Sequence, residues 1–563
     1  MAGASLNIQW IPKRNKNTVN SPRPLLLLVL VLLAGGCTNY SSVIKVQPGY
    51  RSDSAAGEGI DLALSKPSAD PLIQMGRYLD AASTAANDLK ADSGNTQARE
   101  DYNFAISRLF GVIHAARLEP WKTPVKCPGL GKVWNFSVKR DPQASRNPSN
   151  FDIQPADTFA FKGSLVKERT LKSGLGAPLV VVGKSSSKAE SNEFQVSQIS
   201  YGMTGVVFFE GNNCSGSFLD PLAVETVDFE GHSYPLAADF TAPVALALAN
   251  QNHRQMELDG LFHPMDFESK ARLALLQPYD SAKIPILCVH GLGDSQATWA
   301  PLIQALRGDP VIRKNYQFWY FSYPTGYPYP LSAAVLRRRL DAINSRFPDH
   351  KKIVVIGHSM GGMISRTLIT DSGLKLWDAI YDKPPMKMGF TSETRKVMVE
   401  SLIFKPRTDI ARVIFASPSH RGSEEASNFW GRLGSRIIGS PQDIVADPSE
   451  ALAGVKPKST GEQIRQMPNS IDFLNPKNRF VVGLAKLPTA PGVPYHTIIG
   501  DRGKGGNHDR TPPVSTDGIV PYWSSHLDGA KSELVIASDH WTNRHPSGIA
   551  EIDRILHEHL KSR

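Results

Sequence analysis

The chain has 563 residues, a length that predicts more than one folded unit. Of these residues 41% are hydrophobic and 21% are charged, a composition that excludes a fibrous or largely disordered protein. The formal net charge of +10 falls to +6 without the first 36 residues, which hold four basic and no acidic side chains. The remaining basic residues are dispersed and not interleaved with aromatic residues, so no nucleic-acid surface is predicted.

Residues 1–36 have the pattern of an export signal. Lys13, Arg14, Lys16 and Arg23 precede an unbroken apolar run, Leu25–Ala34. A run of this length spans about 15 Å as a helix, roughly half of a ~30 Å hydrocarbon core, so it cannot form a stable transmembrane helix. We therefore predict a signal peptide over residues 1–36.

The end of this segment, Ala34-Gly-Gly-Cys37, resembles a bacterial lipobox. The resemblance implies cleavage before Cys37 and acylation of that cysteine, which would anchor the exported protein to the membrane of the cell envelope. Thr38, rather than an aspartate, follows Cys37 and resembles the outer-membrane sorting pattern. The alternative is an ordinary signal peptide in which Cys37 has no such role.

Two accessory regions are expected after the anchor. Residues 37–69 lack periodicity and predict a flexible tether, whereas apolar residues at helical spacing predict a helical hairpin over 70–118. Short β-branched and aromatic runs, such as Pro178–Val182 and Gly205–Phe209, then predict a β-rich domain over 119–265. Nothing in these regions identifies a ligand, although a partner for the β-rich domain is left open.

The cysteines do not predict a metal site. There is no Cys-x-x-Cys pair and no histidine at metal-ligand spacing, so we expect no metal. Cys288 lies in an apolar strand and is expected to be a small buried side chain. Cys127 and Cys214 both fall in the accessory region of an exported protein, where a disulfide between them and two free thiols are both open.

Strands and helices alternate over residues 270–563, which predicts an α/β domain with a mostly parallel sheet and helices on both faces. One of the helices is expected over 331–347, with Ala334, Leu336, Leu340 and Ile343 on its buried face. The expected strands are 284–289, 316–321, 352–356, 411–416, 495–499 and 533–537.

The strand over 352–356 leads directly into Gly357-His-Ser-Met-Gly361, a Gly-x-Ser-x-Gly nucleophile elbow. In this turn the serine is presented between a strand and a helix with strained backbone, and Gly357 and Gly361 remove side chains that would clash. His358 is the residue before the serine. The pattern predicts Ser359 as a nucleophile.

An oxyanion hole is expected from the loop after the first strand, His290-Gly-Leu-Gly293, together with the residue that follows the nucleophile. We assign its two backbone N–H donors to Leu292 and Met360. His290 precedes the nucleophile in the chain and is expected to shape the loop.

The acid and the base should follow the serine in that order. Asp517 lies after the strand over 495–499, and His540 follows the last strand, so both fall where this chemistry needs them. His545 is followed by Pro546 and is expected to cap a closing helix over 547–560. Asp539, the neighbour of His540, is not expected to orient it.

With these motifs, the sequence resembles a family of bacterial α/β-hydrolases similar to lipases and esterases, some of them lipoproteins with an N-terminal extension. The resemblance covers about residues 195–563. It is carried by Leu276-Gln-Pro-Tyr279, His290-Gly-Leu292, Tyr323-Pro-Thr-Gly326, Gly357–Gly362, His420-Arg-Gly-Ser423, Thr516–Pro521 and His540. The sequence departs from the family pattern at Ser419, which is an extra residue before His420. This departure affects the expected shape of the loop. The family implies hydrolysis of carboxylic esters.

The expected reaction is cleavage of a lipid or small ester through an acyl-enzyme formed on Ser359, with no cofactor. Insertions near 374–408 and 423–494 are expected to be lid-like, although Met386, Met388 and Phe390 in the first could equally pack on the core. Two rival functions remain open: an acyltransferase that uses the same acyl-enzyme, and a non-catalytic binding lipoprotein with a silent hydrolase fold.

Overall fold

The computed structural model describes residues 40–139, 148–183, 200–250, 253–262, 271–424, 426, 452, 455, 469–503 and 516–562. Cys37 and the expected signal peptide lie outside these residues, as does most of the expected insertion over 423–494. Among the described helices, none is both long and apolar enough to cross a membrane.

The segment expected to be a flexible tether contains regular structure from residue 42 onward. Strand β1 (Ser42–Lys45) pairs antiparallel with β5 (Phe159–Lys162). Helix α2 (Ala55–Ser65) begins after Ser54, whose side chain accepts a hydrogen bond from the amide of Gly57, and it buries Ile60 completely. The structure therefore differs from the expectation here, because a capped helix and a strand pairing occupy the segment.

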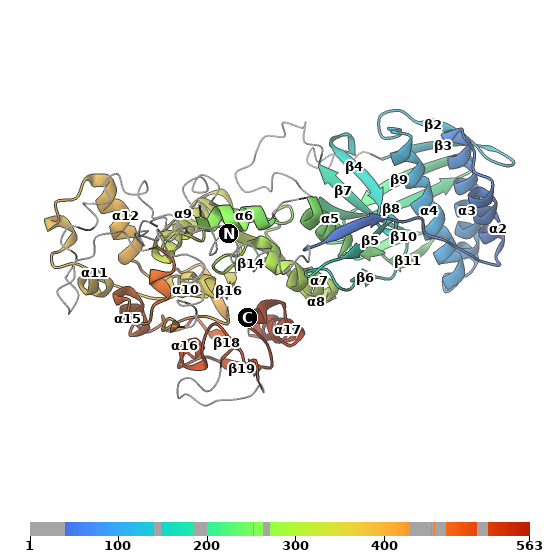
Figure 1. Cartoon of the computed structure of the whole chain (residues 1–563). Coiled ribbons are helices and arrows are strands. Elements are labelled where there is room, and N and C mark those ends of the chain that lie inside the picture. The colour runs from blue at the N-terminus through green and yellow to red at the C-terminus, as the bar shows by residue number, and fades with distance from the viewer. Residues whose placement is uncertain are drawn as a thin grey trace, which may run out of the picture. The chain divides into compact units, whose positions relative to one another are not determined.

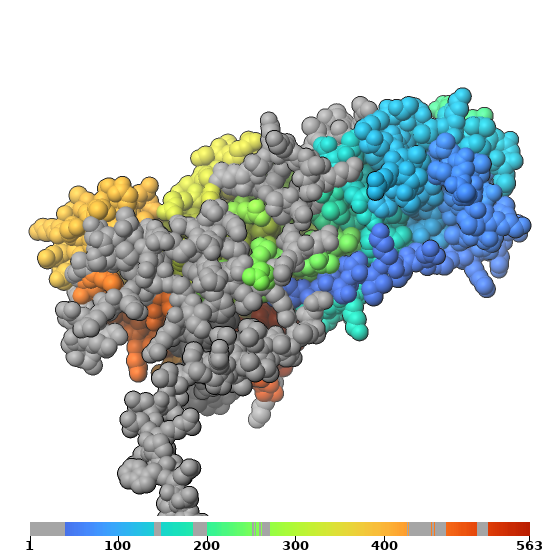
Figure 2. Space-filling model, turned by 45° about the horizontal axis from the view of Figure 1, so that its top comes forward, coloured from blue at the N-terminus to red at the C-terminus, as the bar shows by residue number. Residues whose placement is uncertain are grey.

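The expected helical hairpin consists of α3 (Pro71–Ala91) and α4 (Thr96–Ala115), each capped by a side chain that precedes it, Asp70 and Asn95. The two helices pack on a six-stranded sheet (Figure 1), and the hydroxyl of Tyr102 on α4 donates to the carbonyl oxygen of Val207 on that sheet. Residues of the N-terminal helices, drawn in blue, form part of the surface in Figure 2.

The six-stranded sheet has the order β2-β3-β9-β8-β7-β4, and all of its pairings are antiparallel except β3 with β9. Its strands are β2 (Val125–Pro128), β3 (Val133–Val138), β4 (Phe151–Pro155), β7 (Ala177–Gly183), β8 (Ser200–Glu210) and β9 (Asn213–Leu219). The shorter elements β6 (Leu171–Lys172), β10 (Thr226–Phe229), β11 (His232–Pro235), β12 (Ala238–Asp239), α5 (Ala242–Asn250) and α6 (His253–Phe262) complete this part of the chain.

Cys127 and Cys214 are two buried free thiols. Cys127 lies on β2 and Cys214 on β9, and β3 lies between these strands. Two strand spacings amount to about 9.6 Å, whereas a disulfide needs Cα atoms within about 7 Å. Burial raises the pKa of each thiol to about 12. The open question of a disulfide is thus resolved in favour of two unreactive thiols.

The α/β domain is built on a seven-stranded sheet with the order β13-β15-β14-β16-β17-β18-β19, in which only β13 is antiparallel to its neighbour. Six strands fall where they were expected, and the four-residue edge strand β13 was not anticipated. The strands are β13 (Arg272–Leu275), β14 (Ile284–Val289), β15 (Tyr316–Ser322), β16 (Ile353–His358), β17 (Ile410–Ala416), β18 (Tyr495–Gly500) and β19 (Ser532–Ile536).

Helices cover both faces of this sheet (Figure 1), which confirms the expected layering. On one face, Leu287 and Val355 pack with residues of α9 (Tyr329–Arg346) and α10 (Met360–Thr367). On the other face, Ile286 and Val354 pack with residues of α7 (Ala300–Gly308) and α17 (Pro546–Lys561). The four expected core residues of α9, namely Ala334, Leu336, Leu340 and Ile343, are all buried. The remaining helices are α8 (Pro310–Asn315), α11 (Lys375–Ile380), α12 (Ser392–Leu402), α15 (Arg479–Ala485) and α16 (Tyr522–Ser525).

Two of the three apolar residues singled out in the insertion over 374–408 pack on the core. Met388 and Phe390 are each 6% exposed, and the Phe390 ring contacts the rings of Trp377 and Tyr381. Met386, by contrast, is 78% exposed. Of the two interpretations of these apolar residues, packing on the core is the one that the structure shows for Met388 and Phe390.

Candidate active site

Ser359 lies at the turn between β16 and α10, with backbone dihedrals φ 53° and ψ −122°. Few residues other than glycine adopt a positive φ, so this backbone is strained and must be held by its surroundings. The amide of Ser359 donates to the carbonyl oxygen of Ala416 at 2.9 Å, and the amide of Gly362 donates to the carbonyl oxygen of Ser359 at 2.9 Å. The sharp strand-to-helix turn that the motif predicts is therefore present.

The glycines on either side of Ser359 are required by close packing. A Cβ atom on Gly357 would lie 2.5 Å from Ser365 Oγ and 2.6 Å from the carbonyl oxygen of Gly361. A Cβ atom on Gly361 would overlap with the carbonyl oxygen of Val289 and lie 2.5 Å from that of His290. Any side chain at either position would thus push α10 away from β14 or β16.

The three predicted site residues that are far apart in the sequence are connected by hydrogen bonds. His540 Nδ1 lies 2.7 Å from Asp517 Oδ2, and His540 Nε2 lies 2.8 Å from Ser359 Oγ. An ionised carboxylate only accepts, so Nδ1 of His540 carries the hydrogen and Nε2 is free to accept from the serine hydroxyl. This arrangement allows His540 to remove the proton of Ser359.

The loop after β18 holds the Asp517 side chain in a fixed orientation. Its Oδ1 accepts from the amides of Ile519 at 2.8 Å and Val520 at 2.7 Å, while Oδ2 accepts from His540. Gly518 has φ 94°, which lets the chain turn tightly enough for both amides to reach the carboxylate. The Asp517 side chain is fully buried, so His540 is oriented by an acceptor that solvent does not reach.

The two assigned oxyanion donors lie on either side of Ser359. Met360 is the first residue of α10, so its amide has no partner within the helix and is available to a ligand. Leu292 follows β14 in the turn that contains Gly291, where a Cβ atom would lie 3.0 Å from Ser359 Cβ. The loop therefore passes beside the nucleophile, which is the position that the assignment requires.

Comparison with known proteins agrees with this fold. Residues 286–552 match the model of a family described as the alpha/beta hydrolase family. These residues form an alpha/beta hydrolase domain. The match begins in β14 and ends in α17, so it contains all three hydrogen-bonded residues.

Several solved structures are similar to the hydrolase at a low level. The mature lipase BlEst2 of Bacillus licheniformis is 18% identical, covers 50% of this chain and 97% of its own, and has a TM-score of 0.31. The esterase EaEST of Exiguobacterium antarcticum is 10% identical, covers 50% and 92%, and has a TM-score of 0.26. A search of curated proteins found none that matches. Similarities of this size carry no information about substrate.

Tyr323 supports the oxyanion loop of the hydrolase, a role that the sequence did not predict for this residue. Its hydroxyl donates to the carbonyl oxygen of His290 at 2.6 Å, and its ring stacks on the His290 ring at 4.5 Å between centroids. Thr325 Oγ1 accepts from the amide of Gly293 at 3.2 Å. The motif Tyr323-Pro-Thr-Gly326 was the available signal. His290 is 1% exposed and packs within its loop, as expected.

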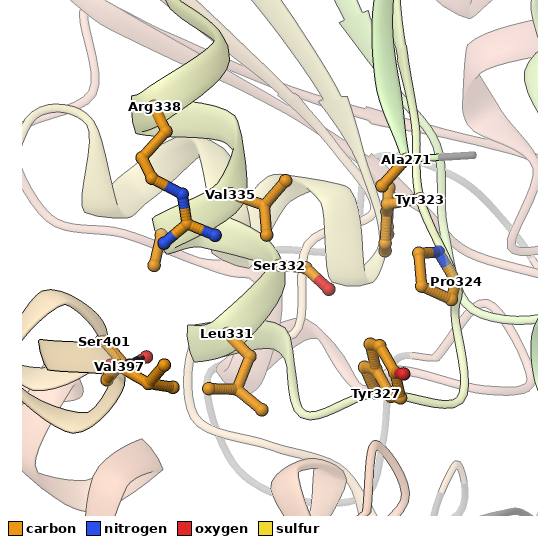
Figure 3. A pocket seen from close by; sticks show the side chains of 11 residues that line it. Ala271, Tyr323, Pro324, Tyr327, Leu331, Ser332, Val335, Arg338, Val397 and Ser401 are labelled. Atoms are coloured by element: carbon orange, nitrogen blue, oxygen red, sulfur yellow. Dashed lines mark hydrogen bonds between the residues drawn. The ribbon is translucent and has the colours of Figure 1, made fainter. Parts of the chain in front are cut away.

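A mostly apolar cavity of about 90 Å³ in the hydrolase is lined in part by Tyr323. Tyr323, Tyr327 and Leu331 form part of its wall, and the hydroxyl oxygen of Ser332 points into it (Figure 3). Ser332 is 2% exposed, and its hydroxyl has no protein partner among the described residues. The Tyr323 ring thus contacts His290 in the loop after β14 and also lines the cavity.

The remaining predicted residues take structural positions in the hydrolase. His545 caps α17, because the amide of Ser547 donates to its Nδ1 at 3.3 Å, which confirms the expected capping role. Asp539 is exposed, and its Oδ1 accepts from the amide of Trp541, so it is not paired with His540. His358 is 2% exposed, and its Nε2 lies 3.0 Å from the carbonyl oxygen of His540.

Proposed function

We propose that this hydrolase cleaves carboxylic esters with Ser359 as nucleophile, His540 as general base and Asp517 as the acid that orients the base. The observation that carries the proposal is the unbroken series of hydrogen bonds from Asp517 through His540 to Ser359, at 2.7 Å and 2.8 Å. The strained backbone of Ser359 supports the same assignment, because a positive φ at a serine is retained only where the surroundings impose it.

The reaction proceeds in two steps. His540 takes the proton of Ser359 as Oγ attacks the ester carbonyl carbon, and it then gives that proton to the departing alcohol oxygen, which leaves an acyl-enzyme. In the second step His540 takes a proton from water, the hydroxide attacks the acyl-enzyme, and the proton returns to Ser359 Oγ as the carboxylic acid departs. No cofactor is needed for either step.

The backbone amides of Leu292 and Met360 stabilise the negative oxygen of each tetrahedral intermediate. Amide donors of this kind are fixed before the reaction begins, and the loss of one such donor typically costs about 10² to 10³ in rate. The bond between Tyr323 and His290 supports the assignment, because it fixes the backbone two residues before Leu292.

We also propose that acylated Cys37 anchors the enzyme to the cell envelope, at the outer membrane. The support is Ala34-Gly-Gly-Cys37, which resembles a lipobox and is followed by Thr38 rather than an aspartate. A membrane anchor favours an ester substrate that is itself part of the membrane.

The test is a hydrolysis series over p-nitrophenyl esters of increasing acyl chain length, with wild type and Ser359→Ala. The proposal expects turnover by wild type on at least part of the series and none above background by the variant. Products are also measured with and without an alcohol acceptor, because transfer of the acyl group to the alcohol in preference to water would identify an acyltransferase. Equal turnover by both proteins would refute the proposed nucleophile.

A further inference from the structure

Two buried polar atoms face one another beside the hydrogen-bonded residues Asp517, His540 and Ser359. Asp294 Oδ2 lies 3.8 Å from His358 Nδ1, and neither atom has a hydrogen-bond partner among the described residues. Asp294 follows the oxyanion loop, and His358 is the last residue of β16 before Ser359. The His358 side chain is 2% exposed and that of Asp294 is 14% exposed, so solvent offers them little compensation.

The other nitrogen of His358 shows where its hydrogen lies. Nε2 is 3.0 Å from the carbonyl oxygen of His540, and a carbonyl oxygen can only accept, so Nε2 carries a hydrogen. Nδ1 of a neutral imidazole is then an acceptor, as is an ionised carboxylate. At 3.8 Å the two facing atoms are too far apart for a hydrogen bond in this structure, and they can approach to form one only when a proton is bound either on Asp294 or on His358.

The surroundings place this proton on Asp294. Burial raises the pKa of Asp294 to about 6, although the positive charge of Arg544 acts in the opposite direction. Burial lowers the pKa of His358 well below its usual value, and His540, Arg544 and His290 lower it further. Tyr323 also faces the pair, and the charge of Asp294 adds to burial in raising the pKa of that tyrosine. Below about pH 6 the favoured form is therefore a carboxylic acid that donates to a neutral imidazole, and above that pH the carboxylate predominates.

We propose that Asp294 and His358 are positioning residues that share one proton and thereby hold the backbone of His540, and with it the imidazole of the base, in reach of Ser359. When the shared proton leaves to water, the imidazole can attract the carboxylate only by moving its remaining hydrogen from Nε2 to Nδ1. Its bond to the His540 carbonyl oxygen is then lost. The inference rests on the proposed function, because His540 must act as a base for its position to affect turnover.

Two substitutions of Asp294 separate this role from simple packing. The side-chain amide of Asp294→Asn can donate to Nδ1 at every pH, so this variant mimics the protonated acid. In a profile from pH 5 to 10, we expect the shared proton to be lost, and kcat of wild type to be lowered, as the pH rises above about 6, and we expect Asp294→Asn to retain its kcat to higher pH. Asp294→Ala removes the donor, and we expect its kcat to fall about 10-fold to 100-fold across the range with little change in KM.

Asp539→Asn is the matched control, since Asp539 is an exposed carboxylate next to His540, and it should keep the wild-type profile. The inference is overturned if Asp294→Asn has the wild-type alkaline limb or if it behaves like Asp294→Ala. If Asp294→Ala does not fold, as judged by its melting temperature, the Asp294→Asn profile alone decides. Ser359→Ala is assayed in parallel, because turnover by that variant would contradict the proposed function and not the positioning role.

Discussion

His540 Nε2 lies 2.8 Å from Ser359 Oγ, although the two residues are 181 positions apart in the sequence. The contact forms because β16 and β19 are parallel strands of one sheet, so the segments that follow them emerge at the same edge. Asp517 follows β18, the strand next to β19, and reaches the same edge. Catalytic groups from separate parts of the chain are expected at this edge of a parallel sheet.

The identity of the base can be tested with His540→Gln and His545→Gln. Loss of His540 should lower kcat by about 10⁴-fold or more, as for other members of such a triad. Loss of His545 removes a helix cap, so we expect most of the activity to remain and stability to fall by about 1 kcal/mol. Turnover and melting temperature are measured for both variants. The opposite pattern of activity would assign the base to His545.

The close packing of the elbow can be tested with Gly361→Ala. A Cβ atom at this position would overlap with the carbonyl oxygen of Val289, which is a backbone atom of the central sheet and cannot move aside. We expect a loss of stability of about 3 kcal/mol or more together with loss of turnover. Gly389→Ala serves as the control, because a Cβ atom there would meet nothing within 4 Å. Equal melting temperatures for the two variants would show that the elbow has room for a side chain.

Much of the site follows from the sequence because its local patterns are strong. The elbow glycines, the buried strands and the order of serine, acid and histidine predicted Ser359, Asp517 and His540 before their distances were known. Other features leave no such pattern. Strand β13 has only four residues, and Met388 and Phe390 have the same composition whether they form a lid or pack on a core. Asp294 and His358 lie opposite one another because of the way β14 and β16 pair. The sequence does not specify that pairing.

A carboxylate of the accessory region should contribute to stability in a pH-dependent way. Burial opposes ionisation of Glu225, but hydrogen bonds from Arg313 and Lys172 outweigh it and lower its pKa to about 2. Because the folded-state pKa lies below the usual value of 4.5, the contribution is present above about pH 4.5 and is lost as the pH falls toward 2.

Glu225→Gln should therefore lower stability at pH 7 by about 1 kcal/mol, a small value because solvent screens the half-exposed carboxylate. The difference from wild type should shrink as the pH is lowered from 4.5 toward 2. Melting temperatures of wild type, Glu225→Gln and the exposed-site control Glu210→Gln provide the measurement. A constant difference across this pH range would show that the charge of Glu225 is not involved.

The proposed lipid anchor predicts a separation of membrane attachment from chemistry. Cys37→Ser should move the protein from the detergent phase to the aqueous phase, because no acyl chain can be attached to serine by this route. Turnover of a soluble ester should stay within about twofold of wild type, since Cys37 supplies no group to the proposed reaction. Thr38→Ala is the neighbouring control. Unchanged partition of Cys37→Ser into detergent would show that another feature holds the protein at the membrane.

The most direct test of the account is to locate the residue that reacts with a fluorophosphonate probe. Such probes form a bond with an activated serine oxygen, so labelling reports the combined action of nucleophile, base and oxyanion donors. We expect mass spectrometry of the labelled wild-type protein to place the adduct on Ser359, and we expect no adduct on folded Ser359→Ala. An adduct on a different serine that persists in Ser359→Ala would contradict the assignment of the active site.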